Sequence, residues 1–232
     1  NTTTKQINEK FKFKTISFEN INFKYPNTKK YIFKKLNVEI KKGDKIGIFG
    51  ESGIGKSTFA DLITGLVKPD RGKVKFNGND INNQIQEIRQ KISYSQQNTC
   101  ILDDTIIKNI ILNKNKDLKL LNKISNIVQL KNFVKTSKNF RKGTGEKGIK
   151  ISGGQKQRIS LARSLYRKPD ILILDEATNA LDEKNEKAFF DNLLNNYPNI
   201  TLIIISHNKK ILSRCENIYE IKNSNIYKLK NK

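Results

Sequence analysis

The sequence of 232 residues contains no methionine or tryptophan, only one histidine and only two cysteines. Two cysteines and the lone His207 exclude a disulfide scaffold and a zinc site built from cysteine and histidine. No apolar stretch approaches the roughly 20 residues that cross a bilayer, and residues 1–14 lack the apolar core of a secretory signal. Because translation begins with methionine, its absence favours a segment of a longer or trimmed chain.

Positive charge is in large excess, with 45 Lys and Arg residues against 22 Asp and Glu and a formal net charge of +23. Clustered basic side chains would indicate a nucleic-acid partner. Here the lysines are scattered over nearly every segment, which favours a compositional bias of the source genome. A membrane-adjacent role could also use the charge. Nucleic acid is therefore the less favoured partner.

Strand-like runs of two kinds occur along the chain. Ile16–Tyr25 and Tyr31–Ile40 alternate apolar and polar residues, as half-buried strands do. Lys45–Phe49 is a short apolar strand-like run. Ile171–Leu174 and Thr201–Ile205 are continuous apolar runs, which are typical of parallel strands covered by helices. We therefore expect a mostly parallel α/β core with an antiparallel sheet near the N-terminus.

Apolar residues at positions i, i+3, i+4 and i+7 predict two helices. The first helix face consists of Phe59, Leu62, Ile63 and Leu66. The second consists of Phe190, Leu193, Leu194 and Tyr197. Residues 79–142 are polar and mostly helical in pattern, without a strong strand. We therefore expect a helical insertion in the middle of the chain.

A glycine-rich loop follows the strand-like run that ends at Phe49. Residues 50–58 read GESGIGKST, which fits the pattern G-x-x-x-x-G-K-[ST] between a predicted strand and a predicted helix. Backbone N–H groups of such a loop surround phosphate oxygens at a helix N-terminus. Lys56 can reach the β- and γ-phosphates, and the Ser57 hydroxyl can hold Mg²⁺. The expected triphosphate-binding residues are Gly50, Glu51, Ser52, Gly53, Ile54, Gly55, Lys56, Ser57 and Thr58.

Two acidic residues end the apolar run at positions 171–176, which reads ILILDE. Asp175 lies where a parallel sheet places a magnesium-binding carboxylate. Glu176 can act as the general base, or orient the water, for attack on the γ-phosphorus. The alternative is a simple acidic turn after a strand. The upstream phosphate loop favours the catalytic interpretation.

Ile151–Gln155, which reads ISGGQ, indicates a second helix N-terminus that could bind phosphate. A serine N-cap followed by two glycines can present an anion-binding helix terminus. A chain with two such termini needs two phosphates, or one ligand that two chains share.

With these three motifs in this order, the chain resembles the nucleotide-binding domain of an ATP-binding cassette (ABC) transporter. ISGGQ is similar to the LSGGQ signature of that family, with Ile151 in place of leucine. The resemblance extends over residues 16–228. It implies a P-loop NTPase fold of the RecA-like type, with a mostly parallel sheet core, an N-terminal antiparallel β subdomain and an inserted α-helical subdomain at about 79–165. Residues 1–14 would be a linker or tail, and residues 15–232 the ATPase domain.

The resemblance also assigns roles to residues outside the three motifs. Tyr25 matches the aromatic that stacks on adenine. Gln97 matches the glutamine that touches Mg²⁺ and communicates with the membrane domain, with Gln96 as the alternative register. Asp182, in the segment NALD, is similar to the SALD loop, and His207 resembles the switch histidine that contacts the γ-phosphate. The implied catalytic residues are Glu176, His207 and Lys56.

The resemblance further implies a head-to-tail homodimer that encloses two ATP molecules. Each ATP would lie between Gly50–Thr58 of one chain and the signature of the other. The implied signature ligands are Ser152, Gly153, Gly154 and Gln155. The implied magnesium ligands are Ser57, Gln97 and Asp175.

Two further segments resemble the exporter branch of the family. Gly145–Gly148 is similar to the GERG segment of exporters, and DDTIIKNI at 103–110 is similar to their GTIRENI stretch. This implies an ATPase that powers export or flipping at the cytoplasmic face of the cell membrane, with a transmembrane domain in the same full-length chain. Cargo would be a lipid-linked saccharide, a polysaccharide or a peptide, with the lipid-linked or saccharide cargo slightly favoured.

Two alternatives remain at this point. A soluble ABC-type ATPase acting on nucleic acid is suggested only by the charge of +23. A cassette that binds ATP without turnover is disfavoured by the intact set of Lys56, Asp175, Glu176 and His207.

Overall fold

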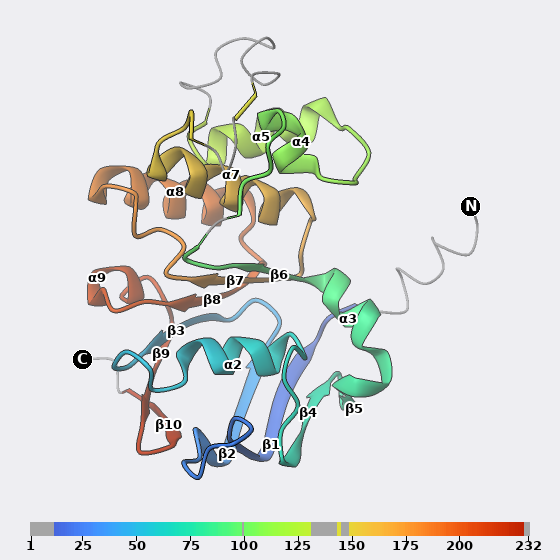
Figure 1. Ribbon diagram of the computed structural model, residues 1–232, viewed down its shortest axis with the longest axis vertical. Coiled ribbons are helices and arrows are strands. Elements are labelled where there is room, and N and C mark those ends of the chain that lie inside the picture. The colour runs from blue at the N-terminus through green and yellow to red at the C-terminus, as the bar shows by residue number, and fades with distance from the viewer. Residues whose placement is uncertain (1–11, 99, 131–142, 145–148, 230–232) are drawn as a thin grey trace. The chain divides into compact units, whose positions relative to one another are not determined.

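The chain forms two compact units (Figure 1). The computed structural model describes residues 12–98, 100–130, 143–144 and 149–229. Unit 1 combines Asn1–Ile92 with Thr201–Lys232, and unit 2 comprises Ser93–Ile200.

Unit 1 contains an antiparallel sheet with the strand order β2-β1-β4-β5. Its strands are β1 (Thr15–Phe23), β2 (Phe33–Lys41), β4 (Arg71–Phe76) and β5 (Asn79–Asp80). The pairs β1–β2, β1–β4 and β4–β5 are all antiparallel. The expected antiparallel sheet near the N-terminus is therefore confirmed.

A second set of strands in unit 1 runs in the order β10-β9-β3-β8. It consists of β3 (Lys45–Phe49), β8 (Thr201–Ile205), β9 (Asn217–Lys222) and β10 (Asn225–Lys228). Strand β3 pairs in parallel with both β8 and β9, and β10 pairs with β9 in the antiparallel direction. All five residues of β8 are buried, as its continuous apolar run predicts.

Helix α2 (Lys56–Ile63) follows the glycine-rich loop of unit 1 and packs its apolar face on the antiparallel sheet. The Phe59 ring stacks on Phe18 of β1, with centroids 4.9 Å apart. The prediction that Leu66 shares this face is wrong, because α2 ends at Ile63 and Leu66 is 57% exposed. Gly65 adopts a left-handed φ of 63°, which ends the helix in the usual glycine manner. Unit 1 also contains η1 (Ile81–Gln84), α3 (Ile85–Lys91) and α9 (Lys209–Leu212).

The described part of unit 2 combines strands with a set of helices (Figure 1). The strands are β6 (Ile92–Ser95), whose first residue belongs to unit 1, and β7 (Ile171–Asp175). The helices are α4 (Ile106–Ile111), α5 (Leu118–Ile127), α7 (Gly153–Tyr166) and α8 (Glu183–Asn196). Helix α7 contacts α4 and α5, and α5 contacts α8.

Two details of unit 2 differ from the sequence predictions. The expectation that residues 79–142 hold no strong strand is wrong, because β6 is a largely buried strand. A four-residue strand is too short for its periodicity to stand out in the sequence. In α8, Phe190 and Leu193 are buried as expected, but Tyr197 is the C-cap and Phe189 completes the buried face.

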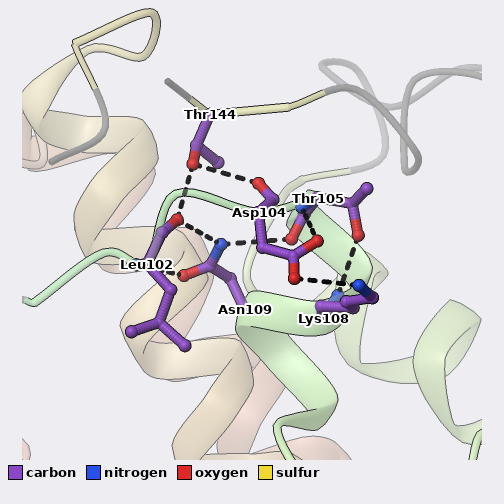
Figure 2. A network of polar contacts seen from close by, with 6 residues as sticks. All are labelled: Leu102, Asp104, Thr105, Lys108, Asn109 and Thr144. Carbon is purple, nitrogen blue, oxygen red and sulfur yellow. Dashed lines mark hydrogen bonds and ion pairs between the residues drawn. The ribbon is translucent and has the colours of Figure 1, made fainter. Parts of the chain in front are cut away.

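A network of polar contacts centred on Asn109 of α4 joins separate segments of unit 2 (Figure 2). The buried Asn109 amide accepts from the Leu102 N–H at 2.8 Å and donates to the Leu102 carbonyl at 3.0 Å. The Thr144 hydroxyl donates to the same carbonyl at 2.7 Å and to the Asp104 carbonyl at 3.0 Å. Arg163 of α7 donates to the Asn109 carbonyl at 2.8 Å. One asparagine thus fixes the segment that precedes α4 against α7.

Replacing Asn109 by alanine is expected to lower the free energy of unfolding by about 2–3 kcal/mol. The substitution removes the side-chain acceptor of the Leu102 N–H, and an unsatisfied buried group costs about 1–3 kcal/mol. It also removes one hydrogen bond of the Arg163 guanidinium, whose Nε keeps its bond to the Asn109 backbone carbonyl. Urea unfolding measures the change. Asn113→Ala, at an exposed position, is the matched control and should change stability by less than about 0.5 kcal/mol. Equal effects of the two substitutions would contradict a structural role for the network.

Candidate functional site

The glycine-rich loop of unit 1 ends at Gly55, the N-cap of α2. Its φ of 117° is a conformation that other residues rarely adopt, and an added Cβ would lie 2.4 Å from Cγ2 of Ile32. No side chain caps α2, so its first N–H groups are not satisfied by a capping side chain. Such a terminus is suited to bind phosphate oxygens.

Lys56 lies at the start of α2 and is only 7% exposed. Its Nζ donates to the Gly50 carbonyl at 2.8 Å and to the Glu51 carbonyl at 2.7 Å. The loop therefore curls around the ammonium group, which holds a positive charge inside the ring of backbone atoms. Ser57, the next residue, is exposed, and its hydroxyl can meet a phosphate oxygen or a metal ion.

Tyr25, the expected adenine-stacking residue, follows β1 and is 39% exposed. Its hydroxyl lies 3.0 Å from Oγ1 of Thr58, the third residue of α2. The Tyr25 ring also borders an open hollow of about 340 Å³. The hollow is lined by Phe23, Lys24, Tyr25, Pro26, Asn27, Val67, Lys68 and Asp70. An aromatic ring, an adjacent hollow and the phosphate loop are thus joined in one part of unit 1.

His207 is exposed and lies two residues beyond β8. Ile205 of β8 pairs with Ile48 of the parallel strand β3, and the Ser206 N–H donates to the Ile48 carbonyl at 3.2 Å. Gly50 lies two residues beyond Ile48. Because the two strands are parallel and in this register, His207 and the phosphate loop leave the same edge of the sheet, where α/β proteins bind ligands.

Asp175 of unit 2 is the last residue of β7 and is 8% exposed. Its Oδ2 accepts from the Tyr94 hydroxyl of β6 at 3.0 Å. Gln97 is exposed two residues beyond β6, the strand next to β7 in the sheet order. A buried carboxylate held by a hydroxyl donor is chemically suited to a magnesium ligand.

Glu176, which follows Asp175, has a left-handed φ of 51°. This conformation costs a residue with a Cβ roughly 1–2 kcal/mol, and such strain is characteristic of functional sites. The Asn179 side-chain amide donates to Oε2 of Glu176 at 3.1 Å. The backbone at Glu176 therefore turns sharply away from β7, with its half-buried carboxylate held by a neighbouring amide.

The ISGGQ segment begins α7 as expected, with Ser152 as the N-cap. The Gln155 N–H donates to the Ser152 hydroxyl at 3.3 Å, and the Ser152 N–H donates to Oε1 of Gln155 at 2.9 Å, which forms a capping box. Ser152 and Gly153 are exposed. Because the Ser152 oxygen accepts in this box, its own hydroxyl proton can still be donated to a ligand.

Asp182 is the N-cap of α8, where its carboxylate accepts from the Asn185 N–H at 2.9 Å. This bond, together with the Asn185 side-chain amide, holds the pKa of Asp182 below its ordinary value. The residue thus has a structural role in addition to the ligand role that the resemblance implies.

The expected site residues divide between the two units. Unit 1 brings together Tyr25, the loop Gly50–Thr58 and His207, whereas Asp175, Glu176, Gln97, Asp182 and the signature belong to unit 2. Gly145–Gly148 lies outside the described residues. Two polar residues of unit 2 were not assigned a role from the sequence. Gln157 contacts the loop before α8, and Asn179 contacts Glu176. For Gln157, the sequence offers one indication, which is its spacing of three from Gly154. That spacing places both residues on one face of the helix.

Among the described residues, no group of three or more His, Cys, Asp and Glu side chains is arranged to hold a metal ion. No helix in the described part of the chain is long and apolar enough to cross a membrane. Burial raises the pKa of the Cys215 thiol to about 12, and the nearby Glu216 charge adds to this effect. Cys215 is therefore protonated at neutral pH and unsuited to act as a nucleophile.

Comparison with known proteins identifies the family. A family model described as ABC transporter matches residues 33–179. P-glycoprotein 14 of Caenorhabditis elegans is 33% identical over 207 residues, which cover 88% of this chain and 16% of that protein. The alpha-hemolysin translocation ATP-binding protein HlyB of Escherichia coli O157:H7 is 34% identical over 211 residues, which cover 90% of this chain and 30% of HlyB. The chain thus spans less than a third of the length of either relative.

A solved structure leads to the same conclusion. A bacterial Atm1-family ABC exporter with ATP bound superimposes with a TM-score of 0.87 and 28% sequence identity, over 92% of this chain and 38% of that one. The β3–loop–α2 unit, the two sheets and the helices α4, α5, α7 and α8 therefore form a P-loop NTPase fold. The chain belongs to the ABC transporter family, as a nucleotide-binding domain of the exporter type.

Proposed function

We propose that the chain binds ATP, hydrolyses it and powers an exporter whose transmembrane domain belongs to the same full-length protein. The observation that carries the proposal is the phosphate loop, in which a buried Lys56 is encircled by backbone carbonyls at the uncapped start of α2. The relative HlyB is named a translocation ATP-binding protein, and the Atm1-family exporter was solved with ATP bound. Both support this assignment.

The residues of unit 1 fit the parts of an ATP molecule. The Tyr25 ring would stack on the adenine beside the hollow, and the N–H groups of Gly50–Thr58 would surround the phosphates. Ser57 would hold Mg²⁺, because an exposed hydroxyl is an oxygen ligand that this hard cation accepts. Bound Mg²⁺ would neutralise charge on the transferring phosphoryl group.

Hydrolysis would depend on a carboxylate and an imidazole. Glu176 would accept a proton from the attacking water or orient it, with one carboxylate oxygen held by Asn179. His207, at the sheet edge from which the phosphate loop starts, would contact the γ-phosphate. Positioning and charge neutralisation account for most of the catalysis of phosphoryl transfer, so the placement of these two side chains is decisive.

The signature would complete the site of a second copy in a head-to-tail homodimer. Ser152 and Gly153 are exposed, and the Ser152 hydroxyl retains a proton to donate, which supports a role toward a ligand outside the capping box. Asp182, in the loop that ends at the cap of α8, would lie in the same interface. A site that needs two copies couples association to hydrolysis.

Mixing two inactive variants tests whether the signature acts on the partner's ATP. Lys56→Ala removes the phosphate-loop ammonium, and Ser152→Glu places a negative charge where a phosphate would bind. Each variant alone is expected to hydrolyse ATP poorly. An equal mixture is expected to exceed the sum of the two separate rates, because a mixed dimer retains one intact pair of loop and signature. Steady-state phosphate release measures all three samples.

A mixture no more active than its two components would contradict the shared site. The matched control mixes Lys56→Ala with a second variant that is also substituted within the loop Gly50–Thr58. Both chains then carry a damaged loop, so no mixed dimer contains an intact loop opposite an intact signature. Light scattering in the presence of ATP and Mg²⁺ checks that mixed dimers are formed.

We place the domain at the cytoplasmic face of a membrane and expect a lipid-linked saccharide, polysaccharide or peptide cargo. The transmembrane domain would select this cargo. The alternative of an ATPase acting on nucleic acid still depends on the charge of +23 alone. The family match and the relatives favour transport.

A further inference from the structure

Helix α7, which begins at the signature ISGGQ, contacts the middle of the loop between β7 and α8. Oε1 of Gln157 accepts from the Ala180 N–H at 2.8 Å, and Gln157 is only 6% exposed. Gly154, one turn earlier on α7, faces the same residue, because a Cβ added there would lie 3.1 Å from the Ala180 carbonyl. Both polar groups of the Ala180 backbone thus lie against one face of α7.

The same loop holds Glu176 at its start. The Asn179 side-chain amide donates to Oε2 of Glu176 at 3.1 Å, and the Asn179 N–H donates to the Glu176 carbonyl at 3.3 Å. The Leu181 N–H donates to the Thr178 carbonyl at 2.9 Å and tightens the turn. Asn179 and Ala180 are consecutive, so a bond that fixes the Ala180 backbone also fixes the direction of the Asn179 side chain.

We propose that Gln157 and Asn179 are positioning residues that set the carboxylate of Glu176 for water attack. The proposal rests on the proposed function, since it assumes that Glu176 acts on ATP. Gln157 of the signature helix holds Ala180, the Ala180 backbone orients Asn179, and the Asn179 amide holds one oxygen of Glu176. A displacement of the start of α7 is thereby transmitted to the carboxylate.

The length of the asparagine side chain is important for this arrangement. The amide nitrogen of asparagine lies one bond further from the backbone than a serine hydroxyl, so a serine at position 179 could not reach Oε2 without a shift of the loop. Glu176 already has a strained φ of 51°, and its side chain has three rotatable bonds. Holding one oxygen removes much of this freedom and so restricts the positions that the carboxylate can take.

Two pairs of variants separate positioning from a structural role. Gln157→Met keeps the volume but removes the acceptor, whereas Gln157→Glu keeps an acceptor at the same place. Asn179→Asp keeps the shape but replaces the donor by a second carboxylate oxygen, whereas Asn179→Gln keeps a donor. The measurements are kcat and KM for ATP with the chain of 232 residues, and thermal unfolding of every variant.

Gln157→Met and Asn179→Asp are each expected to lower kcat by about tenfold, since one hydrogen bond to a charged group is lost or misplaced. KM for ATP should stay within about twofold, because neither residue is placed on the nucleotide. Gln157→Glu and Asn179→Gln should recover part of the lost rate. In the Glu176→Gln background neither lesion should lower the rate further, because both act through that carboxylate.

Asn195→Asp, an exposed substitution on α8 that adds the same charge, is the matched control and should leave kcat unchanged. Lesions that raise KM at constant kcat, or that add fully to Glu176→Gln, would overturn the positioning role. A wild-type chain without ATP turnover would instead overturn the proposed function, and with it this inference. Turnover that Asn179→Asp leaves intact would overturn the inference alone.

Discussion

Replacing Glu176 by glutamine is expected to lower the rate of ATP hydrolysis by about 10²- to 10⁴-fold, the contribution typical of a positioned general base. The change keeps the shape of the side chain and an oxygen for the Asn179 amide, so the fold should be retained. Binding of ATP should change little, because the loss is confined to the transition state. Phosphate release and equilibrium dialysis with ATP measure the two quantities.

With hydrolysis blocked, Glu176→Gln is also expected to accumulate as an ATP-stable dimer, which sedimentation detects. Glu39→Gln is the matched control, because Glu39 is an exposed residue of β2 in unit 1. It should hydrolyse ATP at the wild-type rate. Hydrolysis by Glu176→Gln at that same rate would show that the base assignment is wrong.

Replacing Lys56 by alanine is expected to weaken ATP binding by at least about 30-fold. The ammonium group is almost fully buried in the loop, where its two bonds to carbonyls hold it close to the expected phosphate positions. Hydrogen bonds to a charged group contribute about 1.5–3 kcal/mol each, and 1.4 kcal/mol corresponds to a tenfold change in Kd. Titration with ATP at constant ionic strength measures this change.

Lys45→Ala is the matched control for this prediction. Lys45 begins β3, the strand that leads into the loop, and its Nζ donates to the Gly43 carbonyl at 2.6 Å. Lys45→Ala removes one positive charge, as Lys56→Ala does, but from the end of β3 that lies away from the loop. ATP binding should therefore remain within about twofold of the wild-type value. Equal weakening by both substitutions would mean that Lys56 acts only through the net charge of +23.

The parts of the molecule that the sequence determines are those whose physical cause is local. The continuous apolar run Thr201–Ile205 becomes a fully buried parallel strand because only burial on both faces satisfies it. The phosphate loop is recognisable because φ > 0 at Gly55 demands glycine and the Lys-Ser pair must follow it. Ser152 and Gln155 form a capping box because their spacing of three fits a helix start.

The ends of helices and the short strands are harder to predict from the sequence, because competing local effects decide them. Leu66 fits the helical spacing of α2, yet Gly65 ends the helix first, and β6 is too short to show a period. The Phe189 side chain occupies the buried face of α8 in place of Tyr197, because the helix ends before Tyr197 completes its turn.

Contacts between distant segments were decided only by the tertiary structure. The Tyr25–Thr58 and Gln157–Ala180 hydrogen bonds join residues that are 33 and 23 positions apart. No periodicity encodes such pairs, because their geometry depends on how helices pack on sheets and loops within each unit. The sequence by itself identified the motif residues that are proposed to bind ATP, since motif chemistry is local. Packing decided which polar side chains lie against the Glu176 carboxylate, since that depends on distances between segments that are far apart in the sequence.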